Sequence, residues 1–260
     1  STTFNMAAQG VIKFPVGDGS EITDCGISFT QPDTASRASV IAYPPAIYAV
    51  GATRFRLHDV RVSAGYTCLN ATGNTGGSIL DNLECGALAN TNVIAYDGSY
   101  GFIHINRLEC WPFGIAGTAN LYSSVYSDQT TNCLTIGRVD GFSADTLSLF
   151  RTSIKFTANA AIGGIPFFID NLQLDLNAFL KVSAGRVTIS NLYSTTGADA
   201  INPAVSADAP GAYLSVGDFD AQVDLSTICH VSAIGGGQIS ITGGRTAHTD
   251  TASAAACVSG

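Results

Sequence analysis

A short pattern of alternating apolar residues recurs along this chain, and it restricts the possible folds more than any other feature of the sequence. Each copy has the order apolar, any, apolar, a small or polar residue, any, apolar, any, as in FRLHDVRV, IHINRLEC and FFIDNLQL. The copies occupy residues 55–62, 78–85, 103–110, 134–141, 167–174, 187–194, 214–221 and 239–246, and a looser copy occupies 21–29. Irregular intervals of 20 to 33 residues between copies are typical of a solenoid built from stacked coils.

Each copy of the pattern predicts strands that meet at a corner. Alternation with a period of two residues directs one set of side chains toward the interior, and the fourth position holds residues that accept a sharp turn, such as His58, Asn106 and Ser190. We therefore predict an all-β protein, a right-handed parallel β-helix of about nine rungs in a single domain. A β-sandwich is the alternative, although it would not repeat the same corner. Residues 143–156 read equally well as a helix or as strands.

The composition shows no linker, charge block or other change that would divide the chain. We expect residues 1–20 to lead into the solenoid, residues 21–245 to form it, and residues 246–260 to be a small and polar C-terminal tail. Only 12% of the residues are charged, so Ser, Thr, Asn and Gly must cover the surface, which suits a solenoid or a protein with large subunit contacts. The net charge of −8 opposes nucleic-acid binding. Without a long apolar run we expect no membrane insertion.

The seven cysteines form no CxxC pair and no spacing typical of a zinc site. They stand singly, mostly beside aliphatic residues, so we expect buried reduced thiols in a protein that folds in a reducing cytosol. The four histidines are dispersed, and His58 and His104 fall at different positions of their repeats. We therefore expect neither a metal site nor a cofactor.

Alignment of the copies places acidic residues on neighbouring coils. The position after the third apolar residue is occupied, in order, by Ser28, Arg61, Glu84, Glu109, Asp140, Gln173, Tyr193, Asp220 and Arg245. Because stacked strands lie about 4.8 Å apart, Glu84, Glu109 and Asp140 would form a ladder of three carboxylates. Like charges at this spacing destabilise a sheet, and they raise the pKa of at least one carboxyl group, as a general acid requires.

Such a ladder suggests glycoside hydrolysis, which makes Glu84, Glu109 and Asp140 the candidate catalytic residues. Adjacent members would be roughly 5 Å apart, near the spacing in retaining glycosidases, and the outer two roughly 9–10 Å apart, near the inverting range. Trp111 either offers a stacking surface for a sugar ring or anchors a loop in the core. The other candidate substrate-binding residues are Arg61, Arg107, Arg138 and Tyr193. Exposed ion pairs between these arginines and the acids would explain the same column without any chemistry.

Two segments carry a resemblance to a known family. The stretch QPDTASRASVIAYPPAIYA, within residues 26–65, and WPFG at 111–114 resemble the β-helical section of bacteriophage tail-spike and tail-fibre proteins, whose shaft is a pectate-lyase-like parallel β-helix. The resemblance implies a homotrimer in the virion, joined to other tail or baseplate proteins and folded in the cytoplasm of the bacterial host. It also implies recognition, and in many members of the family cleavage, of a bacterial surface polysaccharide such as capsule or O-antigen. The family has no common catalytic motif from which residue roles could be carried over.

Three functions therefore remain open from the sequence. The first is a polysaccharide depolymerase, which would be a glycoside hydrolase or, with Arg107 or Arg138 neutralising a uronate, a lyase. The second is a receptor-binding spike that holds a glycan without cutting it. The third is a structural β-helical shaft in which the charged column is only surface.

Overall fold

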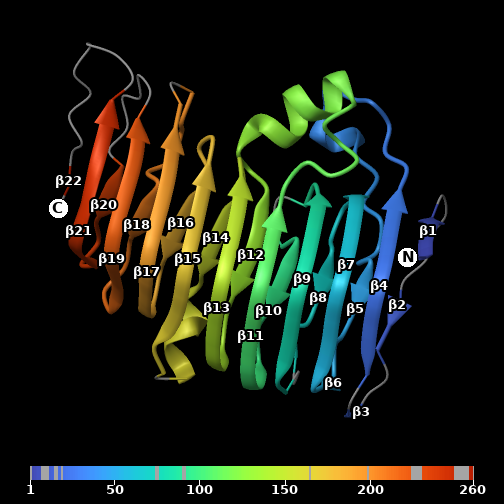
Figure 1. Cartoon of the computed structure of the whole chain (residues 1–260), viewed down its shortest axis with the longest axis horizontal. Helices are drawn as coiled ribbons and strands as arrows, with labels where there is room; N and C mark the ends of the chain where they lie inside the picture. The colour runs from blue at the N-terminus through green and yellow to red at the C-terminus, as the bar shows by residue number, and fades with distance from the viewer. Residues whose placement is uncertain are drawn as a thin grey trace.

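A computed structural model of the chain describes residues 2–6, 12–14, 17–18, 20–73, 76–89, 92–163, 165–197, 199–223, 230–248 and 258–259. Nearly all of its regular structure is β-strand, arranged as two long sheets whose strands run parallel (Figure 1). Within these residues there is no helix with the length and hydropathy needed to cross a membrane.

The first sheet, called the long-strand sheet below, has ten strands. In spatial order they are β1 (Thr2–Met6), β4 (Glu21–Phe29), β7 (Phe55–Gly65), β9 (Ser78–Ala87), β11 (Ser99–Cys110), β13 (Val139–Phe150), β15 (Phe167–Asp175), β17 (Gly185–Thr196), β19 (Ala212–Val223) and β21 (Gln238–His248). Strands β1 and β21 lie at opposite ends of the molecule (Figure 1).

The second sheet, called the short-strand sheet, also has ten strands. They are β2 (Ile12–Lys13), β5 (Ile47–Tyr48), β8 (Leu69–Asn70), β10 (Ile94–Tyr96), β12 (Asn132–Ile136), β14 (Ser153–Phe156), β16 (Phe179–Val182), β18 (Val205–Ala207), β20 (Val231–Ala233) and β22 (Val258–Ser259). A small third sheet pairs β3 (Gly17–Asp18) with β6 (Ala52–Thr53). From β7 onward, successive strands alternate between the two long sheets, as in a parallel β-solenoid.

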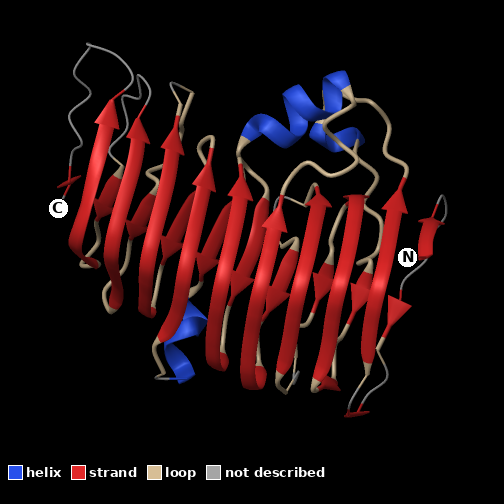
Figure 2. Cartoon of the chain, in the orientation of Figure 1, coloured by secondary structure: helices blue, strands red, loops and turns tan. Residues whose placement is uncertain are grey.

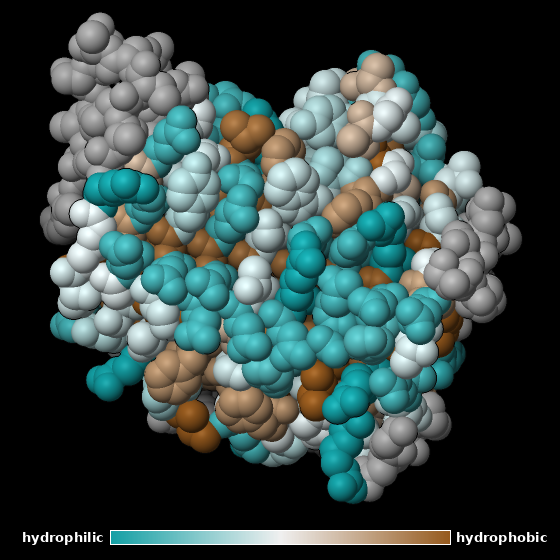
Figure 3. All heavy atoms as spheres, in the orientation of Figure 1, coloured by the Kyte–Doolittle hydropathy of each residue, from teal (hydrophilic) through white to brown (hydrophobic). Residues whose placement is uncertain are grey.

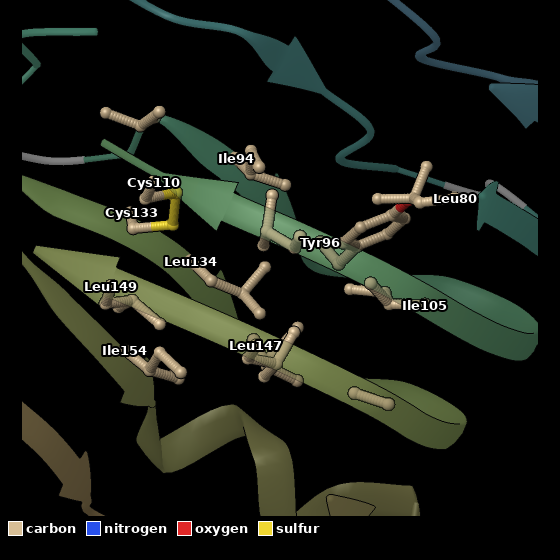
Figure 4. Packing of buried hydrophobic residues seen from close by; sticks show 14 of the residues in the cluster. Leu80, Ile94, Tyr96, Ile105, Cys110, Cys133, Leu134, Leu147, Leu149 and Ile154 are labelled. Carbon is tan, nitrogen blue, oxygen red and sulfur yellow. A yellow bond between two sulfur atoms is a disulfide. The ribbon is translucent and has the colours of Figure 1, made fainter. Parts of the chain in front are cut away.

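The core lies between the two sheets and consists of the alternating apolar residues of the repeat. In β15, for example, Phe167, Ile169, Leu172 and Leu174 are all buried, while the residues between them are more exposed. Figure 4 shows the same arrangement around β11 and β13, where side chains from facing strands interdigitate. The predicted inward direction of these residues is confirmed, and burial of such side chains contributes about 1.5–3 kcal/mol each.

One copy of the repeat was placed wrongly. The pattern at 134–141 lies across the end of β12 and the start of β13, so it spans a turn between the two sheets. The coil is instead formed by FSADTLSL at 142–149, whose inward residues include Phe142, Leu147 and Leu149. The segment 143–156, ambiguous from the sequence, forms most of β13 together with β14. Ala144 occupies an inward position and weakens the apolar pattern of this coil.

A lobe projects from one end of the long strands, between β11 and β12 (Figure 2). It contains two short helical turns, η2 (Leu121–Val125) and η3 (Tyr126–Asp128), and packs beside η1 (Arg37–Ser39). The guanidinium of Arg37 donates two hydrogen bonds to Asp128, of 2.9 and 2.7 Å, and others to backbone carbonyls. The carboxylate of Asp33 accepts the backbone N–H of Leu121 at 2.9 Å. A further turn, η4 (Ala158–Gly163), lies at the opposite end of the strands.

The cysteines correct an expectation from the sequence. Cys68 is joined to Cys85 and Cys110 to Cys133 by disulfides, so four cysteines are not reduced thiols (Figure 4). Both disulfides are buried. Each one links the end of a long strand to the start of a strand in the short-strand sheet, where the two sheets come together. Cys25 is a buried free thiol, as predicted. Two further cysteines, Cys229 and Cys257, lie outside the described residues.

Candidate functional site

The site predicted from the repeat is a line of outward side chains across the long-strand sheet, which we call the polar column. Strand pairing makes it Gly26, Arg61, Glu84, Glu109, Ser148, Gln173, Tyr193, Asp220 and Arg245. Two positions differ from the prediction, since Ser148 stands in place of Asp140 and Gly26 in place of Ser28. The predicted ladder of three acids is therefore a pair, Glu84 beside Glu109.

Asp140 and Arg138 lie elsewhere on the same sheet. Asp140 is the second residue of β13 and precedes Ser148 by eight residues, roughly 26 Å along an extended strand. Arg138 stacks on the ring of Tyr100, 4.3 Å from its centroid, and donates a hydrogen bond of 2.7 Å to the Tyr100 hydroxyl. Its contact with Asp140 is longer, at 4.0 Å. Neither residue can act together with the two glutamates of the column.

Each glutamate of the column is paired with an arginine. Arg61 donates to Glu84 on the next strand, and Arg107 donates to Glu109 on its own strand. These hydrogen bonds raise the pKa of both guanidinium groups. The two carboxylates keep 19% and 21% of their side-chain surface exposed. The four groups together carry no net charge, so the repulsion on which the predicted general acid depends is offset by neighbouring cations.

Aromatic residues of the WPF segment flank the column at the base of the lobe. The indole Nε1 of Trp111 donates a hydrogen bond of 3.0 Å to Ser148 Oγ, and its ring packs on Phe150 with centroids 5.1 Å apart. The ring of Phe113 lies under the guanidinium of Arg61, at 5.1 Å. Trp111 is half-buried, so it is tied to the sheet and also presents part of its surface beside the column.

Beyond Ser148 the column continues with Gln173, Tyr193 and an ion pair between Asp220 and Arg245, and beside Gln173 lies a carboxylate that the sequence did not single out, Asp175. Gln173 donates a hydrogen bond of 2.6 Å to Asp175, and the hydroxyl of Tyr193 lies 3.2 Å from the Gln222 side-chain oxygen. Burial raises the pKa of Asp175. Asp175 pairs in register with Phe150, and so it lies beside the Phe150 ring on which Trp111 packs. No local motif marks Asp175, because its burial comes from neighbouring coils.

Two hollows open along the column. One, of about 310 Å³, is lined by Asp24, Cys25, Gly26, Asp59, Val60, Arg61, Asn82 and Glu84. The other, of about 270 Å³, is lined mainly by Asn171, Gln173, Asn191, Tyr193, Asp218 and Asp220. Both are open, and the first is mainly polar, whereas the second joins polar side chains to exposed apolar surface. This combination suits a ligand that lies along the surface and offers both hydroxyl groups and apolar faces.

Within the part of the chain that the structure describes, no group of three or more His, Cys, Asp and Glu side chains is placed to hold a metal ion. Strand register also keeps His58 and His104 apart, since His58 pairs with Asp81 and His104 with Ile79. Comparison of the chain with protein-family models, with curated proteins and with solved structures finds no match.

Proposed function

We propose that the polar column is a binding surface for a polysaccharide. The observation that carries this proposal is the length and regularity of the column. From Arg61 to Arg245 it crosses eight strands, a span of roughly 34 Å at about 4.8 Å per step. A surface of this length and polarity suits a polymer with many hydroxyl groups better than a small compact ligand.

The side chains of the column match the chemistry of sugars. Arginine, amide and hydroxyl groups offer donors and acceptors in turn, which sugar hydroxyls can satisfy from either side. Trp111 and Tyr193 provide aromatic surface for the C–H face of a sugar ring. A protein of net charge −8 is a poor partner for nucleic acid, whose phosphates need several cations.

The resemblance of the 26–65 and 111–114 segments to phage tail spikes supplies the biological setting for this proposal. In that setting the chain is a right-handed parallel β-helix of about nine rungs, the handedness being that of nearly all parallel strand crossovers. It forms a homotrimer with other tail or baseplate proteins in a virion and binds capsule or O-antigen. The disulfides suit this setting, because a released virion is outside the reducing cytoplasm.

A binding measurement tests the proposal. Surface polysaccharides purified from a panel of bacterial strains are titrated against the chain by calorimetry. For a strain whose polysaccharide binds, Gln173→Ala/Tyr193→Ala is expected to weaken the affinity for that polysaccharide about tenfold or more, which is about 1.4 kcal/mol. The control is Ser206→Ala on the short-strand sheet, which leaves affinity unchanged. Equal affinities for all three proteins would exclude the column as the binding surface.

A second candidate function is hydrolysis of the bound polymer. Glu84 and Glu109 pair directly on neighbouring strands, whose backbones lie about 4.8 Å apart, close to the carboxyl spacing of retaining glycosidases. Asp175 adds a carboxyl group whose pKa is raised by burial, as a general acid requires. If the chain cleaves its ligand, Glu109→Gln or Asp175→Asn is expected to lower the release of oligosaccharides by about 100-fold while binding persists.

The product distinguishes the chemistries. Hydrolysis releases saturated oligosaccharides, whereas a lyase leaves an unsaturated end that absorbs ultraviolet light. If the unmodified chain binds a strain's polysaccharide and leaves it intact, the function is recognition alone.

A further inference from the structure

A second surface of the long-strand sheet lies toward the N-terminal ends of its strands, away from the polar column. We call it the arginine–aromatic band, and its members are Arg54, Arg56, Tyr100, Phe102, Arg138, Phe168, Arg186 and Tyr213. Figure 3 shows hydrophobic atoms gathered along this lower edge of the sheet, below a hydrophilic zone. Neither the polar column nor its hollows use these residues.

Strand register aligns the band across the sheet. Arg56, Ile79, His104, Ser143 and Phe168 occupy one outward position on five consecutive strands. Two residues earlier on their strands, Phe102 pairs with Gly141 and Arg186 with Tyr213. The band therefore runs from β7 to β19, roughly 29 Å at about 4.8 Å per strand.

The aromatic members of the band are unusually exposed. Tyr100, Phe102 and Phe168 keep 52%, 56% and 50% of their surface accessible. Gly141 allows the Phe102 ring to lie flat on the sheet, because a Cβ there would meet the ring at 2.5 Å. Exposed aromatic surface gathered in one place marks a binding surface more often than a single exposed side chain does.

Two arginines of the band, Arg56 and Arg186, are available to bind an anion. Arg56 and Arg186 are exposed, and no ion pair joins either of them to another described residue. Arg186 lies over the Tyr213 ring at 5.2 Å, as Arg138 does over Tyr100 at 4.3 Å.

The acids that face the band balance part of its positive charge. Glu21 pairs in register with Arg56 without an ion pair, Asp140 is 4.0 Å from Arg138, and Asp145 is 3.7 Å from His104. Asp81 also interacts electrostatically with Arg56. Arg56 and Arg186 are the arginines of the band that form no ion pair with a described residue, on a chain of net charge −8.

Two hollows lie within the band. One, of about 490 Å³, is lined by residues that include Arg54, Arg56, Ile79, Phe102 and His104. The other, of about 410 Å³, is lined by residues that include Ile165, Pro166, Arg186 and Tyr213. Each hollow therefore combines a cation with apolar or aromatic surface.

We propose that the arginine–aromatic band binds an acidic polysaccharide, with sugar rings on the aromatic side chains and sugar carboxylates on the arginines. The positive charge of the exposed arginines favours an anionic ligand, and the spacing of the arginines indicates the class of that ligand. Arg56, Arg138 and Arg186 are separated by roughly 14 Å and roughly 10 Å across the sheet, whereas phosphates recur about every 3.4 Å along a DNA strand. Sparse cations between aromatic rings fit a polymer that carries one charge per sugar or fewer. The ligand class rests on the proposed function, but the surface is a different one.

A pair of matched polymers tests this proposal. Polygalacturonate and its fully methyl-esterified form share one backbone, and only the first carries carboxylates. The unmodified chain is expected to bind polygalacturonate at least about tenfold more tightly than the ester. That preference is expected to fall as salt rises from about 50 to 200 mM.

Two double variants with the same net charge locate the binding. Arg56→Gln/Arg186→Gln is expected to lower polygalacturonate affinity about tenfold or more and to flatten its salt dependence. Lys155→Gln/Lys181→Gln removes two charges from the short-strand sheet and is expected to change affinity less than about twofold. Circular dichroism checks that both variants fold.

Several results would overturn the proposal: equal affinity for acid and ester, no binding of polygalacturonate, or equal loss in both double variants. Tighter binding of single-stranded oligothymidylate would make the band a nucleic-acid surface. Self-association that Arg56→Gln/Arg186→Gln abolishes would make it a contact between copies of the chain. Loss of polygalacturonate binding in Gln173→Ala/Tyr193→Ala alone would support the column and overturn the band, so the two proposals fail separately.

Discussion

The long-strand sheet turns the same corner in two different ways. In β4, β7 and β9 the second corner residue has a left-handed backbone, with φ of +49° at Asp24, +49° at Asp59 and +66° at Asn82, and strand pairing omits it. In β15 and β17 the corresponding residues, Asn171 and Asn191, pair in register, and the residue before each is omitted instead. The corner thus shifts by one residue between the two regions.

The change falls between β9 and β11, where both corner residues are left out of the pairing. Glu84 and Glu109 follow the corner on these two strands, so the acid pair lies at the junction between the two geometries. The N-terminal region also carries the lobe and both of the disulfides found among described residues. Residue type alone does not decide the corner, because Asn82 is left-handed and Asn191 is not.

Removing the disulfides tests how much of the N-terminal region depends on cross-links. Cys68→Ala/Cys85→Ala and Cys110→Ala/Cys133→Ala open loops of 17 and 23 residues. Each is expected to lower the free energy of unfolding by about 3 kcal/mol, measured by urea denaturation, because the unfolded chain gains entropy. Cys25→Ala, which deletes one buried atom, is the control and should cost about 1 kcal/mol. Equal losses in the three proteins would show that the cross-links add nothing to this region.

The lobe depends on the ion pair between Arg37 and Asp128. Burial raises the pKa of Asp128, but hydrogen bonds from Arg37 and Thr130 outweigh it, and the net shift is downward. Because the pKa of Asp128 is lower in the folded protein, the ion pair stabilises the fold at pH values above the pKa of the unfolded state, near 3.9. That stabilisation is lost as the pH falls through the pKa of the folded state.

Arg37→Met is therefore expected to cost about 2 kcal/mol at pH 7 and less at pH 2–3, where the carboxyl group is protonated in both proteins. Arg37→Lys should not restore the loss, since an ammonium cannot form the two parallel hydrogen bonds of a guanidinium. Urea titrations between about pH 2 and pH 7 give the comparison. A cost of Arg37→Met that stays constant over this range would remove Asp128 as its cause.

The two corner geometries predict different costs for the same substitution. Asn82→Ala places an alanine, which disfavours a positive φ, at φ +66°. It also removes a hydrogen bond of 2.7 Å to Asp59. Its expected cost is about 2 kcal/mol. Asn191→Ala removes only weaker hydrogen bonds, including one of 3.2 Å to Asn171, and should cost about 1 kcal/mol or less.

Glycine separates the two contributions at the corner. Asn82→Gly should recover part of the loss seen with Asn82→Ala, because glycine accepts a positive φ, whereas Asn191→Gly should recover nothing. Urea midpoints of the four variants measure the difference. Indistinguishable midpoints would mean that the two corners are energetically equivalent.

The repeat was sufficient to predict most of the fold. Alternation in segments such as 55–62 and 167–174 identifies strands, inward residues and the order of coils, because each coil must bury the same face. It also brings Glu84 beside Glu109, since the copies at 78–85 and 103–110 align without insertion. The error at 134–141 arose because a turn between the sheets happens to continue the alternation, while Ala144 weakens the pattern of the coil that follows.

The sequence by itself therefore determined a parallel β-solenoid with an outward polar column, because a period of two residues and a recurring corner admit few other arrangements. Only the tertiary structure decided which cysteines join, that Arg61 and Arg107 neutralise the two glutamates, and that Asp175 is partly buried. It also placed Arg37 against Asp128, 91 residues away. Contacts of this kind depend on how coils stack and where an insertion folds back, and no local pattern of residues records that.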